Sequence, residues 1–172
     1  MRHAITFAFI IYVISAAIPF APLAQPGPVT QREALARELR NAWLPLESGM
    51  TLSRSEGTPI SAKYEIDNGT FQLSVYTMRG DKFAEVIVDY SAGTIVKVDV
   101  ITDSGDLAAA QGQKETMARA KRTLEAATAE VVRTNPGYRA VSAMPGLHDG
   151  RPVVEVILVN DTAWRTVFGD LD

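Results

Sequence analysis

Cysteine is absent from the 172-residue chain, which excludes disulfide bonds, thiol nucleophiles and cysteine-ligated zinc. Histidine is nearly absent, with two residues in the whole sequence. There is no Gly-rich phosphate loop and no pair of closely spaced histidines, and no reliable Ser-His-Asp set can be assembled. The sequence therefore carries no catalytic signature, and we expect a protein that is not an enzyme and that has no cofactor and no metal site.

The chain also lacks an excess of positive charge. Seventeen basic residues stand against 20 acidic ones, which gives a formal charge of -3 and a pI near 5.4. Because nucleic-acid binding depends on neutralising phosphates with Lys and Arg, this balance argues against a nucleic-acid partner. The composition, 47% hydrophobic and 22% charged, is typical of a globular protein. The length fits one domain, or two small units packed together.

The N-terminal residues have the composition of a secretory signal peptide. Met1 to His3 is short and basic, residues 4–17 are almost wholly apolar, and prolines begin at Pro19. We therefore predict a signal peptide over residues 1–24 whose removal leaves an exported protein without a stable membrane span. The alternative is an uncleaved anchor, although the prolines shorten the segment that can cross a bilayer as a helix.

Two stretches have the apolar spacing of amphipathic helices. Thr30-Gln31-Arg32-Glu33 fits a capping box, and apolar residues follow until Pro45, so a helix is expected over residues 30–46. Residues 47–58 are polar and glycine-containing, which predicts a loop or a weak strand. A second helix is expected over residues 114–134, where the apolar positions recur at three- and four-residue steps: Met117, Ala120, Leu124, Ala127 and Val131.

The remaining apolar runs have the character of β-strands. Asn68-Gly69 favours a type I′ hairpin turn, because both positions tolerate a positive φ. Another turn is expected at Arg79-Gly80-Asp81, and the stretch from Phe83 to Ile101 is predicted to form a β-hairpin. Further strands are expected in the C-terminal part of the chain, over residues 138–144, 153–159 and 163–168.

The two halves of the sequence resemble each other at an offset of 81 residues. The offset places Gly69 on Gly150, Phe83 on Trp164 and Asp89 on Asp170 without a gap. We therefore predict an α+β fold of two tandem helix-plus-antiparallel-sheet units, with the helices packed on one face of a sheet that the units can share. The second unit is expected to lack its last strand. The predicted division is 25–104 for the first unit, 105–113 for a linker and 114–172 for the second unit.

Short motifs in both halves resemble those of PepSY domains. Residues 88–96, Val-Asp-Tyr-Ser-Ala-Gly-Thr-Ile-Val, are similar to the ending of that domain, and residues 135–141 followed by 150–156 are similar to its middle portion. Ala92 stands where the family often has threonine, and the second copy ends without the Thr-Gly turn. The resemblance implies a bacterial periplasmic or secreted module, in a family that includes propeptides of secreted peptidases. It transfers no catalytic residue.

Five residues are the candidate partner-contacting or turn-defining positions: Asp89, Gly93, Phe83, Trp164 and Asp170. Aspartates at strand ends commonly accept backbone amide hydrogen bonds, and aromatic residues that open strands commonly pack under a helix. The pair His148-Asp149 fits a solvated turn better than a catalytic dyad. The other turn aspartates match no EF-hand spacing, so a calcium site is not expected.

The best functional hypothesis is non-enzymatic binding of a protein or peptide in the cell envelope, including modulation of an envelope peptidase. Its physical basis is an exposed sheet edge, either at Val96, Val98 and Val100 or at the unpaired end of the second unit, since such an edge can accept an extended peptide. The alternative is an envelope sensor or carrier for a small ligand or metal ion. A hydrolase is the weakest hypothesis, because no nucleophile and base can be named.

Overall fold

The computed structural model describes residues 30–161 and 163–172. The predicted signal peptide, residues 1–24, lies outside these described residues. Within them, no helix combines the length and the apolar character that a membrane crossing requires.

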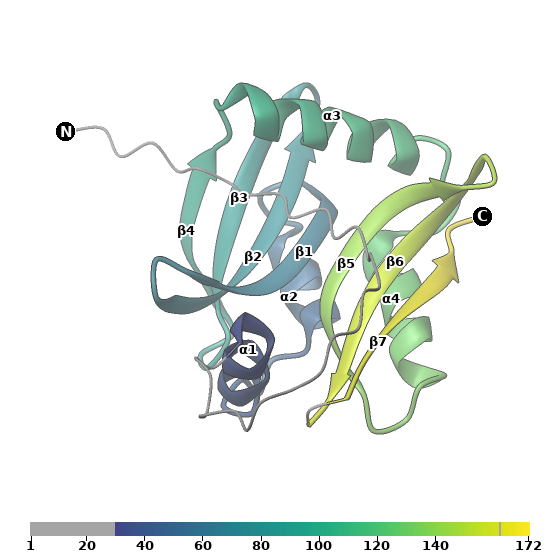
Figure 1. The fold of residues 1–172 in the computed structure, drawn as a ribbon. Coiled ribbons are helices and arrows are strands. Elements are labelled where there is room, and N and C mark those ends of the chain that lie inside the picture. Colours follow the sequence, from purple (N-terminus) through teal and green to yellow (C-terminus); the bar gives the residue numbers. More distant parts are fainter. Residues whose placement is uncertain (1–29, 162) are drawn as a thin grey trace, which may run out of the picture.

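The described chain forms one antiparallel sheet of seven strands in the order β4-β3-β2-β1-β5-β6-β7, accompanied by helices (Figure 1). The strands are β1 (Thr58–Asp67), β2 (Thr70–Arg79), β3 (Lys82–Asp89), β4 (Thr94–Val100), β5 (Arg139–His148), β6 (Arg151–Asn160) and β7 (Ala163–Asp170). The helices are α1 (Gln31–Leu39), α2 (Leu46–Ser53), α3 (Ser104–Met117) and α4 (Leu124–Arg133). The predicted α+β class is confirmed.

The predicted local signals form as expected. The Thr30 hydroxyl accepts a hydrogen bond from the Glu33 amide at 3.3 Å, and the Glu33 carboxylate accepts from the Thr30 amide at 2.9 Å, which completes the capping box of α1. Between β1 and β2, Asn68 and Gly69 have φ values of 47° and 79°, the positive pair that a type I′ turn requires. This turn therefore fixes the register of β1 against β2.

One short pairing joins the two parts of the sheet, which we name the N-terminal half (β1–β4) and the C-terminal half (β5–β7). β1 and β5 run antiparallel and pair through Ala62↔Ala143 and Lys63↔Ser142. Each half is otherwise built from consecutive hairpins. As a result β4 and β7, the last strands of the two halves, form the two outer edges of the sheet.

Helices α2 and α4 lie on the same face of the sheet. Gly49 of α2 sits directly over Leu73, and a Cβ at this glycine would lie 2.4 Å from the leucine side chain. Val131 of α4 packs against Gly169 of β7, where an added Cβ would lie 2.7 Å away. Apolar residues of both helices and both halves form one buried cluster that includes Leu46, Met50, Leu73, Val86, Leu124, Val154 and Leu171.

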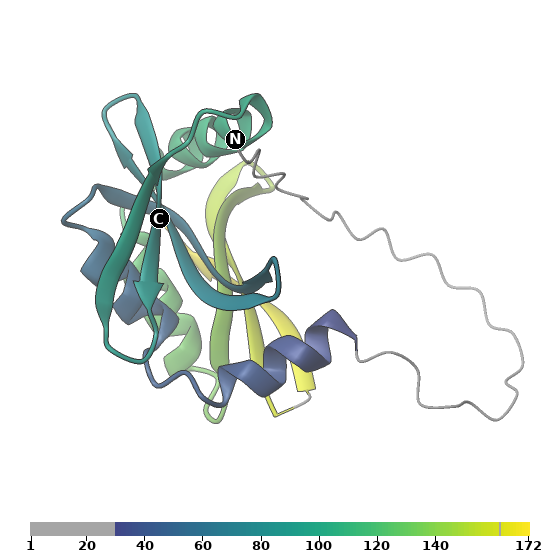
Figure 2. The ribbon, with the colours of Figure 1, turned by 90° about the vertical axis from the view of Figure 1, so that its left-hand side faces the viewer.

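Helices α1 and α3 lie on the opposite face, near its two ends (Figure 2). In α3, Gln113 accepts a hydrogen bond from the Ser61 hydroxyl of β1 at 2.9 Å. The guanidinium of Arg32 in α1 lies 5.6 Å from the centre of the Trp164 ring of β7. The expectation that all helices pack on one face is therefore wrong for α1 and α3, while α2 and α4 follow it.

The region after Pro45 differs from the sequence prediction. Helix α1 ends at Leu39 rather than near residue 46, and residues 46–53 form the separate helix α2 instead of a loop or weak strand. Gly49 suggests a loop in the sequence, but its role here is close packing against Leu73. Leu46 and Met50 are fully buried on the same side of the helix.

The predicted linker and second helix also differ from the structure. Residues 105–113 lie within α3, whose N-cap Asp103 accepts hydrogen bonds from the amides of Gly105 and Asp106. The expected helix over residues 114–134 is interrupted at 118–123, because α3 and α4 lie on opposite faces and the chain must turn between them. The Leu171 carbonyl accepts hydrogen bonds from the amides of Lys121 and Arg122 at this turn.

Candidate functional site

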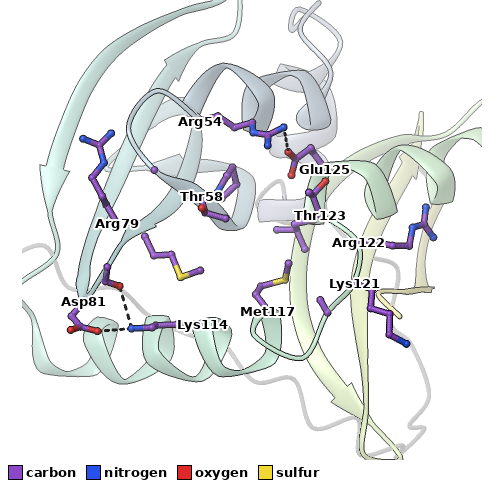
Figure 3. Close-up of a pocket in the computed structure, with 16 residues that line it drawn as sticks. Arg54, Thr58, Arg79, Asp81, Lys114, Met117, Lys121, Arg122, Thr123 and Glu125 are labelled. Atoms are coloured by element: carbon purple, nitrogen blue, oxygen red, sulfur yellow. Dashed lines mark hydrogen bonds and ion pairs between the residues drawn. The ribbon is translucent and has the colours of Figure 1, made fainter.

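A cleft of about 840 Å³ lies at the end of the sheet where α2 stops and α4 begins (Figure 3). Its lining residues fall in three segments of the chain, 54–59, 78–81 and 114–125. These segments come from the end of α2, the β2–β3 turn and the connection from α3 to α4. The cleft therefore depends on how the chain crosses from one face of the sheet to the other.

Ion pairs occupy the rim of the cleft. Lys114 Nζ lies 2.6 Å from Asp81 Oδ1, and Arg54 Nη1 lies 3.1 Å from Glu125 Oε1 (Figure 3). The Lys114 ammonium lowers the pKa of the Asp81 carboxyl. Five basic and two acidic side chains line the cleft in total, so its rim has a net positive formal charge.

The floor of the cleft is apolar. Met78, Met117, Leu124, Pro59 and Ala120 contribute to its lining. Among the described residues no group of three or more His, Cys, Asp or Glu side chains could hold a metal ion. The apolar lining and the basic side chains of the cleft suit an apolar body that carries an anionic group.

Asp89 and its counterpart Asp170 make the same contact at the two strand ends. Asp89 Oδ1 accepts hydrogen bonds from the Ser91 amide at 2.7 Å and the Ala92 amide at 2.9 Å. Asp170 Oδ1 accepts a hydrogen bond from the Asp172 amide at 3.0 Å. In both cases the donor lies two residues after the aspartate. The Ser91 hydroxyl and the two amides lower the pKa of Asp89. Both aspartates therefore stabilise the backbone that follows their strands.

The other candidate residues are separated from one another. Gly93 closes the β3–β4 turn with a φ of 69°, and its amide donates to the Asp89 carbonyl at 2.8 Å. Phe83 is buried beneath α3 together with Ala110. Trp164 is half-buried on β7 under α1. The structure therefore brings the five residues together only in the pair Asp89 and Gly93.

A buried carboxyl group was not foreseen from the sequence. Glu85 of β3 is 5% exposed, and its Oε1 accepts a hydrogen bond from the Tyr76 hydroxyl at 3.2 Å. Burial raises the pKa of Glu85, and burial together with the Glu85 charge raises the pKa of Tyr76. Strand alternation places Glu85 on the face opposite Val86, which predicts a solvated side chain. The sequence contains no signal for its burial.

The outer edges of the sheet present free backbone groups at predictable positions. The amide of Leu171 donates to the Pro152 carbonyl, so this pair is hydrogen-bonded in the β6–β7 ladder. Because hydrogen-bonded pairs alternate in an antiparallel ladder, the backbone groups of Trp164, Thr166 and Phe168 point away from β6. No strand of the described residues pairs with them.

In the N-terminal half, the equivalent backbone groups on β3 are paired with β4. The amide of Ile101 donates to the Phe83 carbonyl, so Phe83, Glu85 and Ile87 direct their backbone groups toward β4. The 81-residue offset places these three positions on Trp164, Thr166 and Phe168. The open edge of β7 thus carries the hydrogen-bonding pattern that holds β4 on β3.

Comparison with known proteins gives no relative: no family model, no curated protein and no solved structure matches the chain. The resemblance to PepSY domains therefore stays a prediction from the residues.

Proposed function

We propose that the chain is an exported, non-enzymatic module of two PepSY-like units that binds an extended segment of a protein or peptide partner along the outer edge of β7. The observation that carries the proposal is the correspondence between the β3 edge, which holds β4, and the β7 edge, which is open in the described residues. An added strand would pair with backbone groups that no described residue uses.

The side chains beside this edge suit an apolar segment. Trp164, Thr166 and Phe168 share the face of β7 opposite α4, and Phe168 is 53% exposed. In strand addition, main-chain hydrogen bonds supply affinity and the alternate side chains supply selectivity. We therefore expect the partner to contribute a strand with apolar or aromatic side chains on this face. Modulation of an envelope peptidase by capture of such a strand is the form of the function that the PepSY resemblance favours.

A synthetic peptide of residues 94–101 tests the proposal, since this segment fits the equivalent edge of β3. Binding is measured by fluorescence anisotropy of the labelled peptide, with Val98→Pro in every protein so that the edge of β4 is closed. Thr166→Pro removes an outward amide of β7 without removing a bond to β6, so binding should be lost. The control Thr166→Val keeps that amide and should bind as well as the parent. Equal binding by both Thr166 variants would exclude the β7 edge.

The cleft favours a second function, the binding of a small amphiphile by a sensor or carrier. Its apolar floor and positive rim match an anionic aromatic dye such as 8-anilinonaphthalene-1-sulfonate. We expect saturable fluorescence enhancement of the dye by the native protein, strong reduction by Met117→Glu and retention by Met117→Leu, with circular dichroism to verify folding. Enhancement that does not saturate, or that is the same in both variants, would remove this function.

A further inference from the structure

Strand β4 has a nearly palindromic sequence with an exchange of charge. Residues 95–101 are Ile-Val-Lys-Val-Asp-Val-Ile, so the apolar residues are symmetric about Val98 while Lys97 is matched by Asp99. An antiparallel copy centred on Val98 places valine against valine and each Lys97 against an Asp99. We infer that two copies of the chain form a symmetric dimer in which the sheet continues from one β4 strand to the other. This goes beyond the proposed function, because it uses the opposite edge of the sheet.

The backbone of β4 directs amides and carbonyls outward at the positions that this pairing requires. Because Ile101 bonds to Phe83, alternation directs the amides and carbonyls of Lys97 and Asp99 toward β3 and those of Val98 and Val100 outward. No strand in the described part of the chain covers this edge. In the dimer the two Val98 residues would exchange a pair of hydrogen bonds across the two-fold axis.

The side chains of β4 are exposed on both faces. Val96, Val98 and Val100 are 62%, 42% and 68% exposed, values that are high for valines in a strand. On the other face, Lys97 Nζ lies 2.6 Å from Asp99 Oδ2, with the two side chains 60% and 36% exposed. Pairing would cover the valines and place each Lys97 opposite Asp99 of the second copy. These are non-hydrogen-bonded positions, where the Cα atoms are about 4.5 Å apart.

The charge pattern favours a contact of β4 with β4 over a contact of β4 with β7. Parallel pairing of β4 with β7 would place Lys97 and Asp99 beside Trp164, Thr166 and Phe168, none of which is charged, and antiparallel pairing would match at most one pair of opposite charges, Asp99 with Arg165. That contact would also be head-to-tail and would leave both a β4 and a β7 edge open for further growth. A β4–β4 contact closes on itself. It is short, because a bulge interrupts regular pairing between Lys97 and Ile95, so we expect a reversible dimer.

Charge exchange within β4 tests the dimer. Lys97→Asp gives the strand two carboxylates and Asp99→Lys gives it two ammonium groups, so each variant opposes like charges at both symmetric positions. Sedimentation velocity over a wide range of protein concentration should show a dimer for the native chain. Each variant should dimerise about 30-fold more weakly, which corresponds to about 1 kcal/mol at each of two pairs.

The decisive sample is an equimolar mixture of the two variants, in which opposite charges face each other again. We expect the mixture to form a dimer with close to native affinity, and the double variant Lys97→Asp/Asp99→Lys to dimerise as the native chain does. Circular dichroism verifies the fold of each variant. The inference would be overturned by a native chain that stays monomeric throughout, by single variants that dimerise normally, by a mixture that stays monomeric, or by open-ended assemblies larger than a dimer.

Discussion

The two halves of the sheet differ most at their outer strands. In the N-terminal half β4 covers the edge of β3, whereas in the C-terminal half β7 is itself the edge within the described residues. Side chains at equivalent positions of the two halves differ in exposure. Glu85 on β3 is buried, whereas Thr166 on β7, 81 residues later, is exposed. One added strand therefore changes the same backbone position from part of a covered sheet into part of an accessible edge.

The halves are much more alike on the face that carries α2 and α4. Each of these helices begins with a fully buried leucine, Leu46 in α2 and Leu124 in α4. Both leucines belong to one apolar cluster that extends across the β1–β5 junction. The halves therefore share a core even though their edges differ, so they should unfold together.

The largest expected effect is that of Leu124→Asp. An uncompensated carboxylate in this core costs more than the 2–5 kcal/mol typical of a Leu→Ala substitution, so both halves should lose cooperative folding. Urea unfolding by circular dichroism measures the loss, and hydrogen exchange measures it in each half separately. Ala126→Asp, at an exposed position of the same helix, is the control and should remain folded. Persistent protection of β1–β4 in Leu124→Asp would show that the halves are independent.

A smaller effect is expected at Glu85, where the halves differ in burial. Because the native state raises the pKa of Glu85, it binds a proton more readily than the unfolded chain does. Stability is therefore lost as the pH rises from the ordinary glutamate pKa, about 4.3, through the raised value. Glu85→Gln should be more stable than the native protein at neutral pH, with the difference narrowing as the pH falls.

The surroundings of Glu85 keep this effect small. Burial and the charge of Glu65 raise the pKa of Glu85, but hydrogen bonding by Ser74 and Tyr76 and the charge of Lys63 lower it, so the cost of burial is partly offset. Denaturant unfolding across this pH range gives the measurement. The matched pair Thr166→Glu and Thr166→Gln on exposed β7 should show no comparable pH-dependent difference. A difference at Glu85 that does not vary with pH would contradict the role of its protonation.

Local patterns in the sequence predicted the parts of the fold that depend on nearby residues. The capping box at Thr30 and the turn at Asn68-Gly69 form because each needs only a few adjacent residues of suitable conformation. The hairpin of β3 and β4 was predicted for the same reason. Residues 47–53 and 105–113 are helical, contrary to the prediction, because Gly49 and the small residues of α3 suggest loops while packing against the sheet stabilises helices there.

The candidate site was only partly accessible from the sequence. The turn-forming role of Asp89 follows from its place at a strand end, and the strand of Val96, Val98 and Val100 is one of the two sheet edges that the sequence offers. The cleft could not be predicted, because its walls come from three segments that meet only where the chain passes between the faces of the sheet. The burial of Glu85 likewise depends on contacts from other strands and has no local signature.

Turn chemistry and side-chain alternation act over a few residues, so the α+β class and the hairpins followed from the sequence alone. The pairing of β1 with β5 and the placement of α3 and α4 on opposite faces were fixed only in the tertiary structure. Those outcomes arise from burying one continuous apolar core, a requirement that the whole chain meets and that no short segment encodes.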